Sequence, residues 1–349
     1  MRDLAQLRRL RSRPAAILCF VALLAAALAA LYAIGAPHYK ADLRARVAEA
    51  LADPGAVRVA VFGNSHSGCV QLGVMGWSGV KLGEGGQDMF EVAHKIARLA
   101  PRLPALETVL VSMSYHSFFY DNAAYSKGGV NTREGKRIDM YAQLPFSPTW
   151  IPGDFDSWLK GVLSPIITED HWKGILEGQR PAATAGMSPD DEGATPKSLA
   201  DVRAAAAKYA GKNTRASLAK SAAAESRLFE AVIANMAARS PDIPARALRA
   251  ALEFSGALER RGVRVVFFTP PYSRDYVARC DPAMKAQMYA AMERIVAETG
   301  AEYLDFSRDP EFADATNVFL NSDHLNLIGA RLFSVRLEER LEETGAARR

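Results

Sequence analysis

Four short apolar runs alternate with helical patterns along the chain, and this alternation limits the possible fold most strongly. The runs are VRVAVFG (57–63), ETVLVSMSY (107–115), VRVVFFTPP (263–271) and the weaker AEYLDFS (301–307). Helical periodicity is found at 39–55, 88–100, 243–262 and 282–300, and a helix precedes each of the three later runs. Strands that alternate with helices indicate a parallel sheet with right-handed crossovers. We therefore predict an α/β domain.

The alternation stops between about 120 and 242. This stretch holds Trp, Pro and Gly residues first, then the small and polar segment 183–198, then an alanine-rich helical pattern at 199–239. A connection of this length without its own structure is rare in a compact domain. We predict a mainly helical insertion, in which 183–198 is a flexible connection.

The N-terminal region has the features of a membrane anchor. Residues 15–36 carry no charge and are long enough to cross a hydrocarbon core of about 30 Å at about 1.5 Å per residue. A cleaved signal peptide is the alternative, but its apolar region usually spans only about 7–15 residues, so we favour an uncleaved anchor. The positive-inside rule then places residues 1–14 in the cytoplasm and 37–349 in the periplasm, with the anchor in the inner membrane. The arginines that set this orientation are Arg2, Arg8, Arg9, Arg11 and Arg13.

Composition excludes several other classes. With 49% hydrophobic and 23% charged residues, the 349-residue chain has the composition of a globular protein. Its net charge of +4 is too small to indicate a nucleic-acid-binding surface. Cys19 lies in the apolar stretch, whereas Cys69 and Cys280 would face an oxidising compartment, where a disulfide between them is permitted but not required. No CxxC or Cys/His metal spacing is present, and we expect neither metal nor cofactor. The four tryptophans are expected to be packing anchors rather than carbohydrate platforms.

The first apolar run ends on Gly63-Asn64-Ser65-His66. In a parallel sheet, the loops at the carboxyl ends of the strands line the site, so Ser65 is placed there. Its hydroxyl would lie near the N-terminus of the next helix, where amide donors favour developing negative charge. The alternative is that Asn64 or Ser65 only caps that helix.

A histidine near the C-terminus strengthens the catalytic interpretation. His324 follows Asp323 in a polar loop, just before a last helix. A histidine base that a carboxylate orients, and that reaches a serine on another strand end, is the arrangement for nucleophilic acyl transfer. The alternative is a surface histidine that caps the last helix. The apolar face of that helix is expected to contain Ala330, Phe333, Leu337 and Leu341.

Three blocks together carry a specific resemblance: VAVFGNSHS (59–67), KLGEGGQD (81–88) and SDHLNLIGA (322–330). They resemble the SGNH (GDSL-like) hydrolase superfamily, and within it the DltD-like, membrane-anchored acyltransferase branch named after a teichoic acid D-alanylation protein. The resemblance implies a flavodoxin-like three-layer sheet over about 57–340, outside the insertion. It also implies Ser65 as nucleophile, with its own amide and that of Gly85 or Gly86 in the oxyanion hole, and His324 and Asp323 as base and acid.

The chain departs from that pattern at two places. In that superfamily a strand between the last two of these blocks usually ends on an asparagine that completes the oxyanion hole, whereas here it ends SMSYHSFF (112–119). Ser114, Tyr115 or His116 would have to substitute, or the hole has fewer donors, and the loss of one donor typically costs about 10²–10³ in rate. The usual acid lies three residues before the histidine, where this chain has Asn321. Asn64 and His66 are further candidates to line the site.

From the resemblance we expect a serine O-acyltransferase that forms a Ser65 ester and acylates an envelope polysaccharide. The resemblance also implies a membrane-bound O-acyltransferase partner that hands acyl groups across the inner membrane. Two alternatives stay open: an esterase that removes such groups, and a non-catalytic polysaccharide-export or scaffold protein with a degenerate site. The missing asparagine suits the last alternative.

Overall fold

The computed structural model describes residues 2–35, 41–124, 133–167 and 211–344, with a few isolated residues between 172 and 204. Its centre is a sheet of five parallel strands in the order β2-β1-β3-β4-β5. This confirms the predicted α/β class. The strands are β1 (Val59–Gly63), β2 (Gly79–Lys81), β3 (Thr108–Ser112), β4 (Arg264–Thr269) and β5 (Glu302–Asp305).

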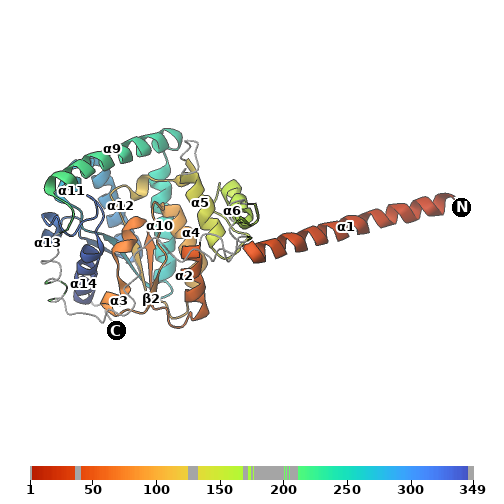
Figure 1. Ribbon diagram of the computed structural model, residues 1–349, viewed down its shortest axis with the longest axis horizontal. Coiled ribbons are helices and arrows are strands. Elements are labelled where there is room, and N and C mark those ends of the chain that lie inside the picture. Colours follow the sequence, from red (N-terminus) through yellow and green to blue (C-terminus); the bar gives the residue numbers. More distant parts are fainter. Residues whose placement is uncertain are drawn as a thin grey trace.

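Helices cover both faces of the sheet (Figure 1). Residues that alternate along β1 belong to different cores: Ala60 and Phe62 pack with one set of helices, and Val59 and Val61 with the other. The first set contains α2 (Ala41–Ala52), α4 (Met89–Leu99), α10 (Ile243–Glu259) and α12 (Pro282–Thr299). The second contains α3 (Leu72–Met75), α13 (Pro310–Ala313) and α14 (Leu327–Glu343).

The described part of 120–242 is mainly helical. It contains α5 (Arg133–Gln143), α6 (Phe155–Ile167) and α9 (Arg215–Arg239), whereas 183–198 lies outside the described residues. A buried ion-pair network joins α5 to the α/β core, because the guanidinium of Arg137 lies 2.5 Å from Asp88 and 3.1 Å from both Asp121 and Asp154. Buried charges are tolerated only when they are paired in this way. The region is therefore packed into the domain.

The N-terminal helix α1 (Arg2–Gly35) projects away from the domain (Figure 1). Its segment Ala16–Gly35 is long and apolar enough to cross a membrane or to serve as a signal sequence, with a mean hydropathy of 2.7. Residues 16–34 are exposed apart from the half-buried Tyr32, and only Gly35 at the end is buried. The end of α1 contacts α6.

The cysteines do not form the bridge that the sequence leaves open. Cys69 and Cys280 are both buried free thiols. They belong to the two different cores on opposite faces of the sheet, Cys69 beside α3 and Cys280 at the end of α11 (Arg274–Arg279). Two thiols separated by a sheet are out of bonding range.

The strand order creates the position of the site. The chain passes from β1 to β2 on one side of β1 and then crosses to β3 on its other side, and ligands of such sheets bind at this switch point. Gly63 ends β1 there with a φ of +119°. A Cβ at Gly63 would lie 2.7 Å from the carbonyl oxygen of Ser112, so only glycine permits this approach of β1 and β3.

Candidate active site

Ser65 lies directly after β1, at the first position of the short 3₁₀ helix η2 (Ser65–Cys69). The side chain of Asn64 caps this helix, because its oxygen accepts a hydrogen bond from the His66 amide at 3.0 Å. The capping role that the sequence leaves open for either residue therefore belongs to Asn64. Ser65 keeps its hydroxyl for another partner.

That partner is His324, whose Nε2 lies 2.8 Å from Ser65 Oγ. Its Nδ1 lies 2.6 Å from Asp323 Oδ1 and 3.2 Å from Asn321 Oδ1. This bonding pattern assigns the ring proton to Nδ1, so Nε2 is the lone-pair acceptor for the serine hydroxyl. Helix α14 is capped by the Asn326 side chain, which accepts from the Gly329 amide. His324 is therefore not the helix cap.

The electrostatics of the trio fit a base and its orienting acid. Burial would lower the pKa of His324, but the hydrogen bond to Asp323, its charge and that of Glu225 outweigh burial and raise the pKa above 6.5. Burial would raise the pKa of Asp323, but hydrogen bonds and charge from His324 and His66 hold it well below its usual range. Asp323 is 2% exposed, and its lowered pKa keeps it ionised. A carboxylate in this position is able to stabilise a protonated His324.

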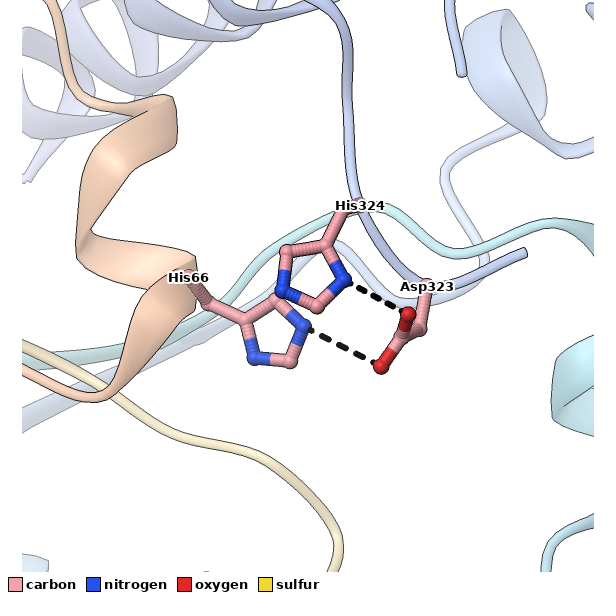
Figure 2. Close-up of side chains that lie close together, drawn as sticks. All are labelled: His66, Asp323 and His324. Carbon is pink, nitrogen blue, oxygen red and sulfur yellow. Dashed lines mark hydrogen bonds and ion pairs between the residues drawn. The ribbon is translucent and has the colours of Figure 1, made fainter. Parts of the chain in front are cut away.

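A second histidine lies beside His324, with their ring centroids 4.6 Å apart, and faces the other oxygen of the same carboxylate (Figure 2). His66 Nε2 lies 3.6 Å from Asp323 Oδ2, and its Nδ1 lies 2.7 Å from Ser114 Oγ. Asn64 Nδ2 donates to the same Ser114 oxygen at 2.8 Å, so the Ser114 proton points to His66 Nδ1 and leaves the His66 proton on Nε2, facing Asp323. Burial, and then the charge of His324, lower the pKa of His66. His66 is therefore a neutral support for the aspartate.

His66, Asp323 and His324 also offer ligand atoms that lie within 4.8 Å of one another, the spacing that a metal ion needs. Both nitrogens of His324 are already engaged, Nδ1 by Asp323 and Nε2 by Ser65. Metal binding at His324 Nε2 would have to displace the serine hydroxyl. The ring nitrogens of His324 and Nδ1 of His66 have hydrogen-bond partners within the protein, so no metal ion is needed to explain their arrangement.

A cavity of about 200 Å³ opens beside the Ser65 hydroxyl. Gly86 lines it, and a Cβ built on Gly85 would lie 4.0 Å from Ser65 Cβ, so the predicted oxyanion segment borders the nucleophile. The carbonyl of Gly85 accepts a hydrogen bond from Lys136 Nζ at 2.7 Å. The lining residues are Asn64, Ser65, His66, Gly86, Gln87, His116, Ser117, Tyr120, Leu228, Phe229, Asp323 and His324.

The three candidates to replace the missing asparagine differ in position. His116 lines the cavity and stacks on Phe229 of α9, with ring centroids 4.2 Å apart. Ser114 is fully buried in the His66 network, and Tyr115 is buried against Tyr272. Only His116 of these three therefore faces the space beside Ser65.

Helix α9 contributes residues that the sequence analysis missed. Glu225 accepts hydrogen bonds from Ser322 Oγ, next to Asp323, and from Ser221 Oγ at 2.6 Å on its own helix. Asn213 Nδ2, just before α9, donates to the carbonyl of Phe319 at 2.7 Å. These bonds hold the 319–324 loop against α9. An alanine-rich helical pattern carries no signal for such contacts, since glutamate is equally common on solvated faces.

Comparisons with known proteins add no identification. No protein-family model matches the chain, and no curated protein matches it. The functional interpretation therefore depends on the geometry of the site.

Proposed function

We propose that this protein is an SGNH-type serine O-acyltransferase that acylates an envelope polysaccharide through a Ser65 ester. The observation that carries the proposal is the continuous chain of hydrogen bonds from Ser65 Oγ to His324 Nε2 at 2.8 Å and from His324 Nδ1 to Asp323 at 2.6 Å. A serine, a base within hydrogen-bond reach and a carboxylate that orients the base are what covalent acyl transfer requires.

The chemistry proceeds in two balanced halves. His324 Nε2 takes the hydroxyl proton as Ser65 Oγ attacks the acyl carbonyl, and it returns that proton to the departing group when the tetrahedral intermediate collapses to a Ser65 ester. An acceptor hydroxyl then gives its proton to His324 and attacks the ester carbonyl, which releases Ser65 with its proton restored. In this proposal the amides of Ser65 and of Gly85 or Gly86 stabilise the oxyanion. In support, Gly86 lines the cavity beside Ser65, and a Cβ on Gly85 would lie 4.0 Å from Ser65 Cβ.

The same machinery hydrolyses the ester when water is the acceptor, so an esterase is the second candidate. His324 has 29% of its side chain exposed, which gives water access to the base. In our proposal a membrane-bound O-acyltransferase supplies the acyl group, and α1 holds the domain on the periplasmic side of the inner membrane. The polysaccharide is the acceptor.

Covalent labelling tests the mechanism. A fluorophosphonate probe should label Ser65 stoichiometrically, and Ser65→Ala should abolish labelling. Ser67→Ala is the matched control, because the neighbouring Ser67 hydroxyl is buried and donates to the Asn64 carbonyl at 2.8 Å, and this variant should be labelled.

Turnover of p-nitrophenyl acetate and polymer acylation in cells complete the test. Ser65→Ala and His324→Ala should each abolish both activities, and the double variant should lose little more than either single one, because the two residues act as a unit. A folded wild-type protein without any Ser65 labelling would support the non-catalytic scaffold instead.

A further inference from the structure

The surface of α6 and of the loop before it carries a group of exposed large apolar side chains. Among the described residues outside α1, ten such side chains are exposed, and five of them lie between 146 and 167. We call this group the α6 patch: Phe146 (60% exposed), Trp150 (40%), Phe155 (49%), Leu159 (39%) and Ile167 (65%). Exposed apolar patches of this kind mark interaction sites.

The patch is an ordered surface. The rings of Trp150 and Phe155 lie 5.0 Å apart, and both contact Trp158, at 5.2 Å and 5.4 Å. The Trp158 ring is held in place by a hydrogen bond, in which its Nε1 donates to the Ser147 carbonyl at 2.8 Å. Phe155 and Leu159 share one face of α6 because they are four residues apart. Trp150 thus packs against neighbouring rings, as the sequence analysis expects of the tryptophans, and it is also 40% exposed.

The position of the patch indicates its occupant. Helix α6 contacts α1 and lies at its foot (Figure 1), and Gly35, the last residue of α1, is buried. When Ala16–Gly35 spans a bilayer, its C-terminal end lies at the boundary between hydrocarbon and water. The patch next to it then lies at the same depth, where tryptophan and other aromatic rings are enriched.

We propose that the α6 patch inserts its aromatic and aliphatic side chains into the bilayer surface beside α1 and so orients the domain on the membrane. Asp156 and Lys160 each follow a patch residue on α6 and form an ion pair with 2.6 Å between nitrogen and oxygen. In this orientation the pair remains in the headgroup region. The domain is then held at two points, the span and the patch. This proposal rests on α1 remaining in the membrane and is independent of the catalytic assignment.

Depth-dependent quenching in vesicles tests the proposal with the full-length protein. Cys19→Ser removes the exposed cysteine, since the other two are buried, and Phe155→Cys then carries an NBD fluorophore. The control is Leu320→Cys, which is 68% exposed on the loop between α13 and α14. These two helices lie at the opposite end of the long axis from α1 (Figure 1). Intact mass of the purified protein verifies that α1 is present.

In vesicles of phosphatidylethanolamine and phosphatidylglycerol that contain doxyl-labelled lipid, we expect NBD at position 155 to be quenched about threefold more than at position 320. Leu159→Cys, one turn further, should match position 155. Equal quenching at 155 and 320 would overturn the proposal. A fluorophore at 155 that is shielded from aqueous iodide but not quenched by doxyl lipid would also overturn it, and would identify the patch as a protein contact. An unlabelled Ser65 in the probe assay would leave the inference intact.

Discussion

The imidazole of His66 lies 3.6 Å from the oxygen of Asp323 that His324 does not use. One carboxylate therefore serves two histidines, of which one reaches the serine and the other reaches back into the β3 end through Ser114. Each oxygen of the Asp323 carboxylate therefore faces one imidazole. Substitutions at Asp323, His66 and Asn321 are therefore expected to have different effects.

Asp323→Asn should lower turnover of p-nitrophenyl acetate by roughly 10²–10⁴, because an amide stabilises the imidazolium poorly and permits the wrong tautomer. Asn321→Ala should have a smaller effect, since Asn321 lies 3.2 Å from His324 Nδ1 whereas Asp323 lies 2.6 Å away. Steady-state kinetics of both variants decide the assignment. A silent Asp323→Asn beside a damaging Asn321→Ala would move the acid to position 321.

His66→Ala should reduce kcat about tenfold, the loss expected when one buried polar support is removed, while fluorophosphonate labelling of Ser65 persists. The matched control is His94→Ala, a half-buried histidine on α4 whose pKa burial lowers to about 4 and which has no contact with the triad. Its kcat should equal that of the wild type. A wild-type kcat in His66→Ala would show that Asp323 needs no second histidine.

The pH profile of kcat/KM should have an acidic limb with its midpoint above 6.5. His324 must be neutral to accept the serine proton, and its pKa is raised, so activity is absent at low pH and appears as the pH rises through that elevated pKa. Asp323→Asn removes the main group that raises the pKa and should move the limb to lower pH. A wild-type midpoint at or below 6.5 contradicts this.

Glu225 is expected to act as a positioning residue with two separable effects. Glu225→Gln keeps an oxygen for the Ser322 hydroxyl but removes the charge that helps to raise the pKa of His324, so the acidic limb should move down with little change in the plateau. Glu225→Ala also loses the tether to the 319–324 loop, and its plateau should fall about tenfold. The control is Glu230→Gln, at an exposed position on the same helix. Identical profiles for all variants would exclude Glu225 from the site.

Much of the α/β frame follows from the sequence, because buried parallel strands are continuous apolar runs that are visible without context. β1, β3, β4 and β5 lie inside the four runs. β2 was missed because it has three residues, of which only Val80 is buried. The predicted apolar face of the last helix is confirmed: Ala330, Phe333, Leu337 and Leu341 are all buried.

The site is less visible in the sequence. Ser65 and His324 are placed at strand and loop ends by topology, but neighbouring residues such as Asp323 and His324 usually point apart. They converge here because the chain turns back on itself: the Leu320 amide donates to the His324 carbonyl at 2.8 Å. Glu225 is 97 residues from Ser322 and belongs to the insertion, so only tertiary packing brings it to the triad.

Ser65 and His324, the proposed nucleophile and base, are 259 residues apart in sequence. A chain that is threaded across a membrane from its N-terminus exposes Ser65 early and His324 only when almost all of it has passed. Without its base the serine hydroxyl is a poor nucleophile. Helix α14, which follows His324 directly, packs against α3 and η2 beside Ser65, so the last helix to arrive closes the nucleophile loop. In our proposal, Ser65 therefore becomes reactive only after secretion and folding are complete, and a chain that is arrested during secretion has an unreactive serine.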